Sequence, residues 1–189
     1  MVTFIPIKRA DSAVLDILKD ARLAGVTYRY LPWGEEKGYT SGHEGVDDDI
    51  AAVVLDLADR GKVVVTWAMT GALEGLTLLA EEAYSGTIDE VLEAAEREAW
   101  RNHIGHSITS VAASWQISGE DCPESLWSIR IGFPEGSVVI ALGQVRASIE
   151  YMPDELVVIF DSSLARSYLP LGVYESAWGV PISPPEGSE

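Results

Sequence analysis

The segment 33–46 concentrates the side chains best suited to binding or to proton transfer. It holds four glycines, with Trp33, Tyr39, His43 and Glu44 among the residues between them. Connections of this length without secondary structure of their own are often binding loops or lids. Its rings could anchor a partner, and His43 with Glu44 could serve as acid and base over a substrate. The plainer alternative is a surface loop whose aromatic rings fold back onto the core.

Three consecutive aspartates, Asp47, Asp48 and Asp49, follow this segment. Hard divalent cations take several carboxylate oxygens, but consecutive residues at a helix start point in different directions. The helix dipole favours negative charge at that position. We therefore expect the aspartates to begin a helix and to hold no metal, and we count Asp47 and Asp48 among the residues that contact a partner.

Two further groups of reactive side chains are weaker candidates. His103 and His106 have a spacing that allows a shared metal, but Gly105 is expected to end a helix between them. Cys122 is the only cysteine and lies beside two carboxylates, whereas a working thiolate needs cationic surroundings. We expect no metal, no cofactor and no catalytic residue from either group.

Trp178 stands in a weakly patterned stretch near the end of the chain. A large aromatic ring is costly to expose without a purpose. It either packs the end of the chain onto the body of the protein or contacts a partner, and we include it in the partner-binding set.

The elements that position these residues begin with a predicted β-α-β unit. Strands are expected at 2–7 and 26–31, on either side of a helix at 11–24. Apolar residues recur at helical spacing over 47–61 and over 72–84, and a valine-rich strand is expected between them at 62–69. This half of the chain is therefore expected to be an α/β portion.

The second half changes from a helical to an alternating pattern. Thr87 and Glu90 form a capping box that predicts a helix over 87–102. Alternation then predicts five strands, at 111–117, 127–133, 138–142, 145–151 and 156–160, and a short helix follows at 162–168. The expected fold class is α+β, in which the N-terminal β-α-β/helical portion packs on a C-terminal five-strand antiparallel meander covered by a helix.

This pattern also predicts how the chain divides. Residues 1–86 form the α/β portion, residues 87–180 form the helix with its antiparallel sheet, and residues 181–189, with two prolines and two glutamates, form a flexible tail. The two larger parts could equally be one compact domain.

The net charge of −17 lies entirely beyond Val46. Residues 1–46 hold six basic and six acidic side chains, whereas residues 47–105 hold four and thirteen, and residues 106–189 hold three and eleven. Such a field attracts basic proteins and repels nucleic acid and anionic membranes. A single cysteine and no uncharged stretch of the ~20 apolar residues that span a membrane indicate a cytoplasmic protein.

These features favour a non-catalytic intracellular protein, of the inhibitor or immunity type, that neutralises a basic protein partner such as a toxin. In size and acidity the chain resembles bacterial immunity proteins. One alternative is a small hydrolase-like enzyme with its site in segment 33–46. Another is a subunit that docks through Trp178 and the end of the chain.

Overall fold

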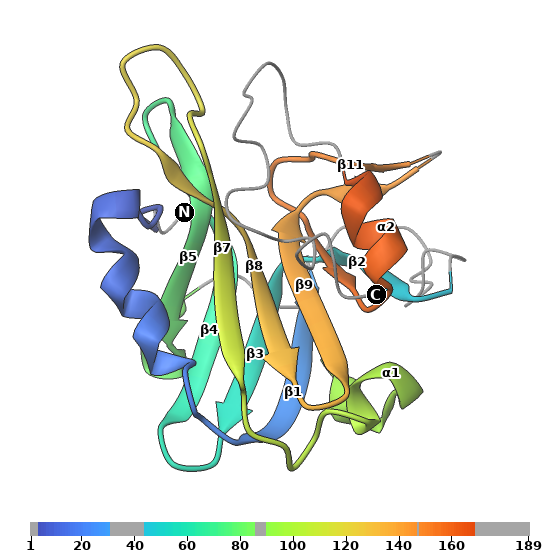
Figure 1. The fold of residues 1–189 in the computed structure, drawn as a ribbon. Coiled ribbons are helices and arrows are strands. Elements are labelled where there is room, and N and C mark those ends of the chain that lie inside the picture. Colours follow the sequence, from blue (N-terminus) through green and yellow to red (C-terminus); the bar gives the residue numbers. More distant parts are fainter. Residues whose placement is uncertain (1–3, 31–43, 86–89, 147, 169–189) are drawn as a thin grey trace.

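Two five-stranded antiparallel sheets lie face to face in the computed structural model, which describes residues 4–30, 44–85, 90–146 and 148–168 (Figure 1). Sheet I has the strand order β5-β4-β3-β1-β6, and sheet II has the order β2-β12-β9-β8-β7. The strands of sheet I are β1 (Leu23–Tyr30), β3 (Ala52–Leu57), β4 (Gly61–Thr70), β5 (Leu73–Ala80) and β6 (Glu90–Glu93). The strands of sheet II are β2 (Val46–Ile50), β7 (Ser110–Gln116), β8 (Ser125–Phe133), β9 (Gly136–Leu142) and β12 (Leu156–Ile159).

The remaining elements are short. Two strands, β10 (Gln144–Val145) and β11 (Ile149–Glu150), form a separate antiparallel pair. The helices are the 3₁₀ segments η1 (Arg9–Ile17), η2 (Glu81–Ala83) and η3 (Ala94–Glu96), and the α-helices α1 (Glu98–Arg101) and α2 (Ser162–Ser167). Within the described ranges, none of these helices has the length and apolar character needed to cross a membrane.

The hydrophobic core fills the space between the two sheets. Sheet I contributes residues such as Leu55 and Val65, and sheet II contributes residues such as Ile129 and Ile140, all at most 1% exposed. A second apolar cluster lies on the outer face of sheet II, where Ala165 of α2 and Tyr168 pack on β9 and β12. This arrangement is a sandwich of two sheets, because each sheet buries one full face against the other.

The expected α+β fold class is wrong. The structure is mostly β, and the N-terminal β-α-β/helical portion is absent from the described residues. η1 is a 3₁₀ helix that ends at Ile17, and residues expected in its last turn already belong to β1. The five-strand meander is covered by sheet I and not by a helix, because β1, β3, β4 and β5 supply the apolar surface that faces it.

The two helices expected at 47–61 and 72–84 are strands. Residues 47–61 contain most of β2 and all of β3, and residues 72–84 contain β5 with η2. Both stretches are buried on two faces: Val53 and Leu55 face the core, while Ala52 and Val54 pack near Tyr84 on the outer face of sheet I. A strand buried on both faces lacks alternation, so apolar residues at helical spacing occur in it without a helix.

The helix expected at 87–102 is also wrong, and its residues are divided among three elements. β6 pairs with β1 from Thr27↔Glu93 to Tyr30↔Glu90, followed by η3 and the single turn of α1. Arg97 was expected to pair with Glu93, but its guanidinium contacts Asp47 instead. Pairing along the edge of β1 satisfies backbone groups over a longer distance than local helix propensity can offset.

Most strands of the second half were predicted at their observed positions. β7, β8, β9 and β12 correspond to four of the five expected strands, and α2 corresponds to the expected short helix. Residues 145–151 form parts of the β10-β11 pair and do not join sheet II. The fifth strand of sheet II is β2, which comes from the first half of the chain and pairs with β12.

Each sheet therefore combines strands from both sides of residue 86. Sheet I takes β6 from beyond that residue, and sheet II takes β2 from before it. Whether 1–86 and 87–180 could fold separately stays a prediction, and the tail at 181–189 lies outside the described residues.

Candidate functional site

β2 is an edge strand of sheet II and carries two aspartates selected from the sequence. Its side chains alternate between the two faces of the sheet. Asp47 faces the core and meets Tyr28 of β1, whereas Oδ2 of Asp48 accepts a hydrogen bond from the backbone N–H of Val145 at 3.3 Å on the other face. Asp47 is 2% exposed and Asp48 is 5% exposed, so both are buried in spite of their charge.

Asp47 belongs to a buried polar network that joins β1, β2 and α1. The Tyr28 hydroxyl donates to Oδ2 of Asp47 at 2.9 Å, and the indole N–H of Trp100 donates to the Tyr28 hydroxyl at 2.5 Å. A guanidinium nitrogen of Arg97 lies 2.6 Å from Oδ1 of Asp47. The carboxylate thus has a hydrogen-bond donor and a cation, the partners that a buried charge requires.

The environment of this network holds Tyr28 in its neutral form. Burial, and then the negative charge of Asp47, raise the pKa of Tyr28 well above its usual value. Burial also raises the pKa of Asp47, while Arg97 and the hydrogen bond from Tyr28 oppose that change. Since the Asp47 carboxylate is already paired, contact between Asp47 and a partner requires the network to open, and its role as a partner contact stays a prediction.

A group of carboxylates gathers beside the other end of β2. This carboxylate cluster consists of Asp48 and Asp49 of β2, Glu74 of β5, and Asp154 and Glu155 in the turn before β12. Burial raises the pKa of Glu155, and repulsion from Asp49, Asp48 and Asp154 raises it further. Of the described cations, Arg146 is the one whose charge acts against this shift.

Glu74 extends the carboxylate cluster to the neighbouring sheet. Burial and then repulsion from Glu74 raise the pKa of Asp154. The Tyr151 hydroxyl donates a hydrogen bond to Glu74, and the Tyr151 ring lies 4.9 Å from the ring of Trp127 between centroids. Burial and the contact with Glu74 raise the pKa of Tyr151, which therefore remains a donor. Carboxylates from β2, β5 and the turn before β12 thus form one region of negative charge.

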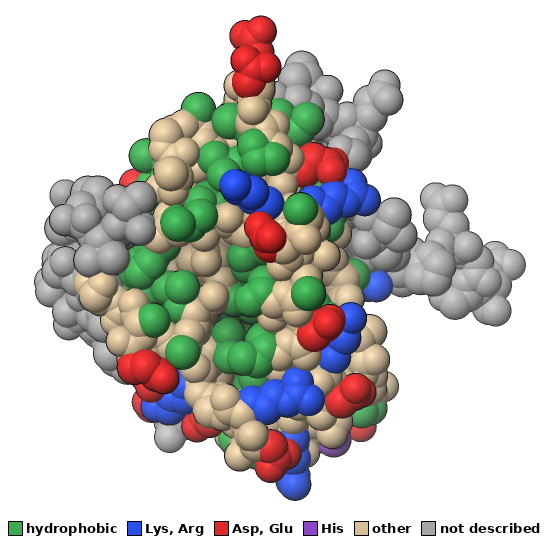
Figure 2. All heavy atoms as spheres, turned by 90° about the vertical axis from the view of Figure 1, so that its left-hand side faces the viewer, with side chains coloured by type: hydrophobic (Ala, Val, Ile, Leu, Met, Phe, Trp, Pro, Cys, Tyr) green, Lys and Arg blue, Asp and Glu red, His purple; other side chains and the backbone are tan. Residues whose placement is uncertain are grey.

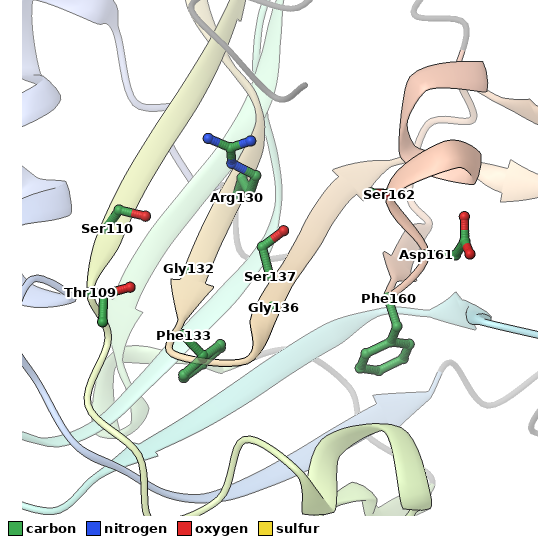
Figure 3. A pocket seen from close by; sticks show the side chains of 10 residues that line it. All are labelled: Thr109, Ser110, Arg130, Gly132, Phe133, Gly136, Ser137, Phe160, Asp161 and Ser162. Carbon is green, nitrogen blue, oxygen red and sulfur yellow. The ribbon is translucent and has the colours of Figure 1, made fainter. Parts of the chain in front are cut away.

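A pocket of about 450 Å³ opens on the outer face of sheet II (Figure 3). Arg130 of β8 and Ser137 of β9 stand on its floor, and Phe133 and Phe160 lie along one side. A side chain at Gly132 would place its Cβ 2.2 Å from the Ser110 hydroxyl oxygen, so only glycine leaves room for that hydroxyl. Burial lowers the pKa of Arg130.

The donors of this pocket suit a carboxylate or phosphate oxygen, but its surroundings do not favour an anion. Guanidinium and hydroxyl groups are common partners of such oxygens. The carboxylate at the rim, Asp161, accepts from the backbone N–H groups of Ser163 and Leu164 and so caps α2. The net charge of −17 also opposes the approach of a free anion. The carboxylate cluster is therefore the better candidate site.

The remaining site residues predicted from the sequence fall in different places. Glu44 is exposed just before β2, next to Gly45, whose carbonyl oxygen accepts a hydrogen bond from the Phe160 N–H at 2.9 Å. Trp33, Tyr39, His43 and Trp178 lie outside the described residues, and so does most of the segment proposed for an enzyme site. Their roles stay predictions.

The two histidines considered as metal ligands occupy different environments. His103 is buried, and its ring stacks on Phe133 with 4.6 Å between centroids, while His106 is exposed. Burial lowers the pKa of His103, so its imidazole is neutral near pH 7 and is not the helix-end cation expected from the sequence. Across the described ranges, no cluster of three or more His, Cys, Asp or Glu side chains has a metal-binding arrangement.

Sequence reasoning missed the residues that complete these two groups. Tyr28 and Trp100 are 72 positions apart, and Glu74 is 77 positions from Tyr151. No local pattern links such distant residues. The only available signal was the acidic pair Asp154–Glu155 after Pro153, which marks a turn but does not indicate its neighbours.

Comparison of this chain with protein families, curated proteins and solved structures gave no match. The fold and the site therefore define a class, an acidic two-sheet sandwich with an anionic region at one sheet edge, on physical grounds alone.

Proposed function

We propose that this protein is a non-catalytic cytoplasmic binding protein, of the inhibitor or immunity type, that neutralises a basic protein partner. The carboxylate cluster is the observation that carries the proposal. Asp48, Asp49 and Asp154 raise the pKa of Glu155, so these acids share one region and are not scattered. Ionised groups that repel one another gain most from a cation placed among them.

The basic side chains of the protein support the same reading by their positions. Arg9 pairs with Glu124, Lys19 with Asp16, and Arg97 with Asp47. Arg29 and Lys62 both contact Glu81. These cations are engaged away from the carboxylate cluster, which leaves the cluster to attract a cationic partner from solution and to increase the rate of association.

Other contacts in the proposal come from the sequence. Glu44 is exposed near α2, and Trp33, Tyr39, His43 and Trp178 are the aromatic and imidazole side chains suited to the centre of an interface. Alanine substitutions at these positions, measured by binding, extend the test beyond electrostatics.

The test is calorimetric titration of the protein with a panel of basic toxin domains and nucleases at several salt concentrations. We expect at least one tight complex whose affinity falls as salt rises, because the attraction is screened over a Debye length of about 8 Å at physiological ionic strength. Failure to bind any member, or binding that salt does not weaken, would count against the proposal.

A matched pair of double variants separates the carboxylate cluster from the general field. Asp154→Asn with Glu155→Gln removes two charges from the cluster, and Glu120→Gln with Asp121→Asn removes two charges from the exposed β7-β8 connection. Asp154 and Asp121 have similar left-handed backbone angles, φ 68° and 63°, which asparagine also tolerates.

The two double variants should bind differently. We expect the cluster variant to weaken binding about tenfold or more, and the control to weaken it less than about threefold. Equal losses would indicate that only the total charge matters and that the cluster is not the site.

A further inference from the structure

β7 differs from the other three edge strands of the two sheets. β2 contains Asp47, Asp48 and Asp49, β5 contains Glu74, and β6 begins and ends with glutamate. β7 has the sequence Ser-Val-Ala-Ala-Ser-Trp-Gln, which contains neither a charge nor a proline. Charges on an edge strand discourage another strand from pairing with it. Three edges are thus protected by acidic residues, and β7 is not.

An apolar groove of about 400 Å³ runs beside β7. Its walls are Val111, Ala113 and Trp115, which share one face of β7, and Ala13 and Leu15 of η1. In the part of the chain that the structure describes, β7 pairs with β8 alone. A strand added to the other edge of β7 would direct alternate side chains onto the same face as Val111 and Ala113, and so into this groove.

The side of the molecule that carries this groove is close to electrically balanced. Asp16 and Lys19 line the groove and pair with each other at 2.6 Å, and Arg9 pairs with Glu124 nearby. Figure 2 shows this side, with hydrophobic side chains across its middle and acidic and basic side chains interspersed around them. Val14 and Ile17 of η1 are exposed aliphatic residues, at 40% and 38%.

The charge distribution identifies the occupant. Two copies that each carry a net charge of −17 repel each other over most orientations. They can approach closely only where acids and bases are matched, and the groove of η1 and β7 is such a place. A basic partner, in contrast, gains nothing from a neutral groove and is drawn to the carboxylate cluster.

We propose that β7 is a self-association edge, at which β7 of one copy pairs antiparallel with β7 of a second copy about a two-fold axis. Val111 and Ala113 of each copy then enter the groove of the other. The contact is isologous, so the same surface serves both copies and the assembly closes at a dimer. The groove meets this requirement because it provides both the small apolar side chains that enter and the apolar walls that receive them.

Sedimentation of the full chain over a range of concentrations tests this proposal. We expect a monomer-dimer equilibrium that shifts toward dimer as salt rises, since salt screens the repulsion between the two copies. This dependence is opposite to that expected for a basic partner, so either proposal can fail while the other holds. A chain that stays monomeric at every concentration and salt level would overturn the dimer.

Two variants with the same change in charge locate the interface. Val111→Lys places a cation in the groove, and Val14→Lys places one on an exposed part of η1 outside it. Both substitutions make the net charge less negative, so general repulsion falls equally. We expect Val111→Lys to raise the dimer dissociation constant about tenfold or more, because paired lysines oppose each other across the two-fold axis, and Val14→Lys to change it less than about threefold. Equal effects would refute the assignment to β7.

Hydrogen exchange on the unaltered protein provides a measurement that does not depend on the folding of a variant. Backbone amides of residues 110–113 should gain protection as protein concentration rises, because pairing of β7 covers its free edge. Unchanged protection across the range in which dimer forms would place the interface elsewhere.

Discussion

At the scale of single residues, the Tyr28 hydroxyl determines how the two sheets meet at one end of the sandwich. It accepts from Trp100 and donates to Asp47, so one oxygen connects α1 to β2. Arg97 supplies the charge that keeps the Asp47 carboxylate ionised in a buried position. A network of this kind is costly if it is incomplete, and therefore favours one arrangement of these elements over alternatives.

Glu155 allows a prediction on pH. Its pKa is raised in the folded protein by burial and by Asp49, Asp48 and Asp154. The folded state therefore binds a proton more tightly than the unfolded state, and ionised Glu155 lowers the free energy of unfolding at neutral pH. We expect Glu155→Gln to be more stable than the unaltered protein at pH 7, and this advantage to decrease as pH falls through the raised pKa. Urea unfolding between pH 4 and 7 measures it.

Glu135→Gln is a control for this comparison, because Glu135 is exposed in the β8-β9 turn. Its effect on stability should stay small across the same range of pH. An advantage of Glu155→Gln that grew toward acid would contradict the sign assigned to Glu155.

At the scale of elements, the N-terminal segment joins the two sheets at one edge. The N–H of Ile7 donates to the carbonyl oxygen of Leu76 in β5 at 3.0 Å, and the carbonyl oxygen of Ile7 accepts from Leu126 in β8 at 2.8 Å. Ile7 thus bridges sheet I and sheet II. Gly75 lies beside this bridge, where β5 approaches the backbone of β8.

Gly75→Ala tests how tightly these elements pack. A Cβ at position 75 would lie 2.7 Å from the Leu126 carbonyl oxygen and 3.1 Å from the Cβ atoms of Pro6 and Ser125. Backbone must move to remove this overlap, so we expect a loss of about 1–3 kcal/mol in the free energy of unfolding. Urea denaturation measures the loss.

Gly25→Ala in β1 is the matched control. Its Cβ would meet the Cβ of Asp56 at 3.6 Å, an ordinary contact, and the change should stay within about 1 kcal/mol. If Gly75→Ala were as stable as Gly25→Ala, the close approach of β5 and β8 would not be as tight as these distances indicate.

At the scale of the whole molecule, charge is separated between two sides. The carboxylate cluster lies at the β2 edge of sheet II, and the balanced groove lies at the β7 edge of the same sheet. A dimer formed through β7 would therefore leave both carboxylate clusters free for basic partners. The two proposed interactions are compatible in one assembly.

The total charge gives a prediction on salt. A net charge of −17 repels itself more strongly in the folded state than in the expanded unfolded chain. Sodium chloride shortens the Debye length from about 30 Å at 0.01 M to about 10 Å at 0.1 M, so the melting temperature should rise over this range. Calorimetry at low protein concentration, where dimer is absent, measures it.

The double variant Asp154→Asn with Glu155→Gln should show a smaller rise, because two of the repelling charges are gone. A melting temperature that fell with added salt would indicate that the ion pairs outweigh the general repulsion, contrary to the small contribution expected of exposed pairs.

The sequence by itself determined features that depend on near neighbours. The alternating pattern of β7 and β8 predicts strands, since one face of each is buried and the other is more polar. Asp161 with the residues after it predicts the short helix α2, and the acidic excess beyond Val46 follows from composition. The candidate site was predicted only in part: Asp48 belongs to the carboxylate cluster, but Glu74, Asp154 and Glu155 were not selected.

The tertiary structure decided what depends on distant contacts. Residues 47–61 and 72–84 fit a helix locally, and they became strands because each found partner strands and apolar cover on both faces. Asp47 was expected on the surface and is buried, because Tyr28 and Arg97 reach it from other elements. Hydrogen bonding between strands and the burial of charge are satisfied by residues far apart in the chain, so local propensity could not reveal them.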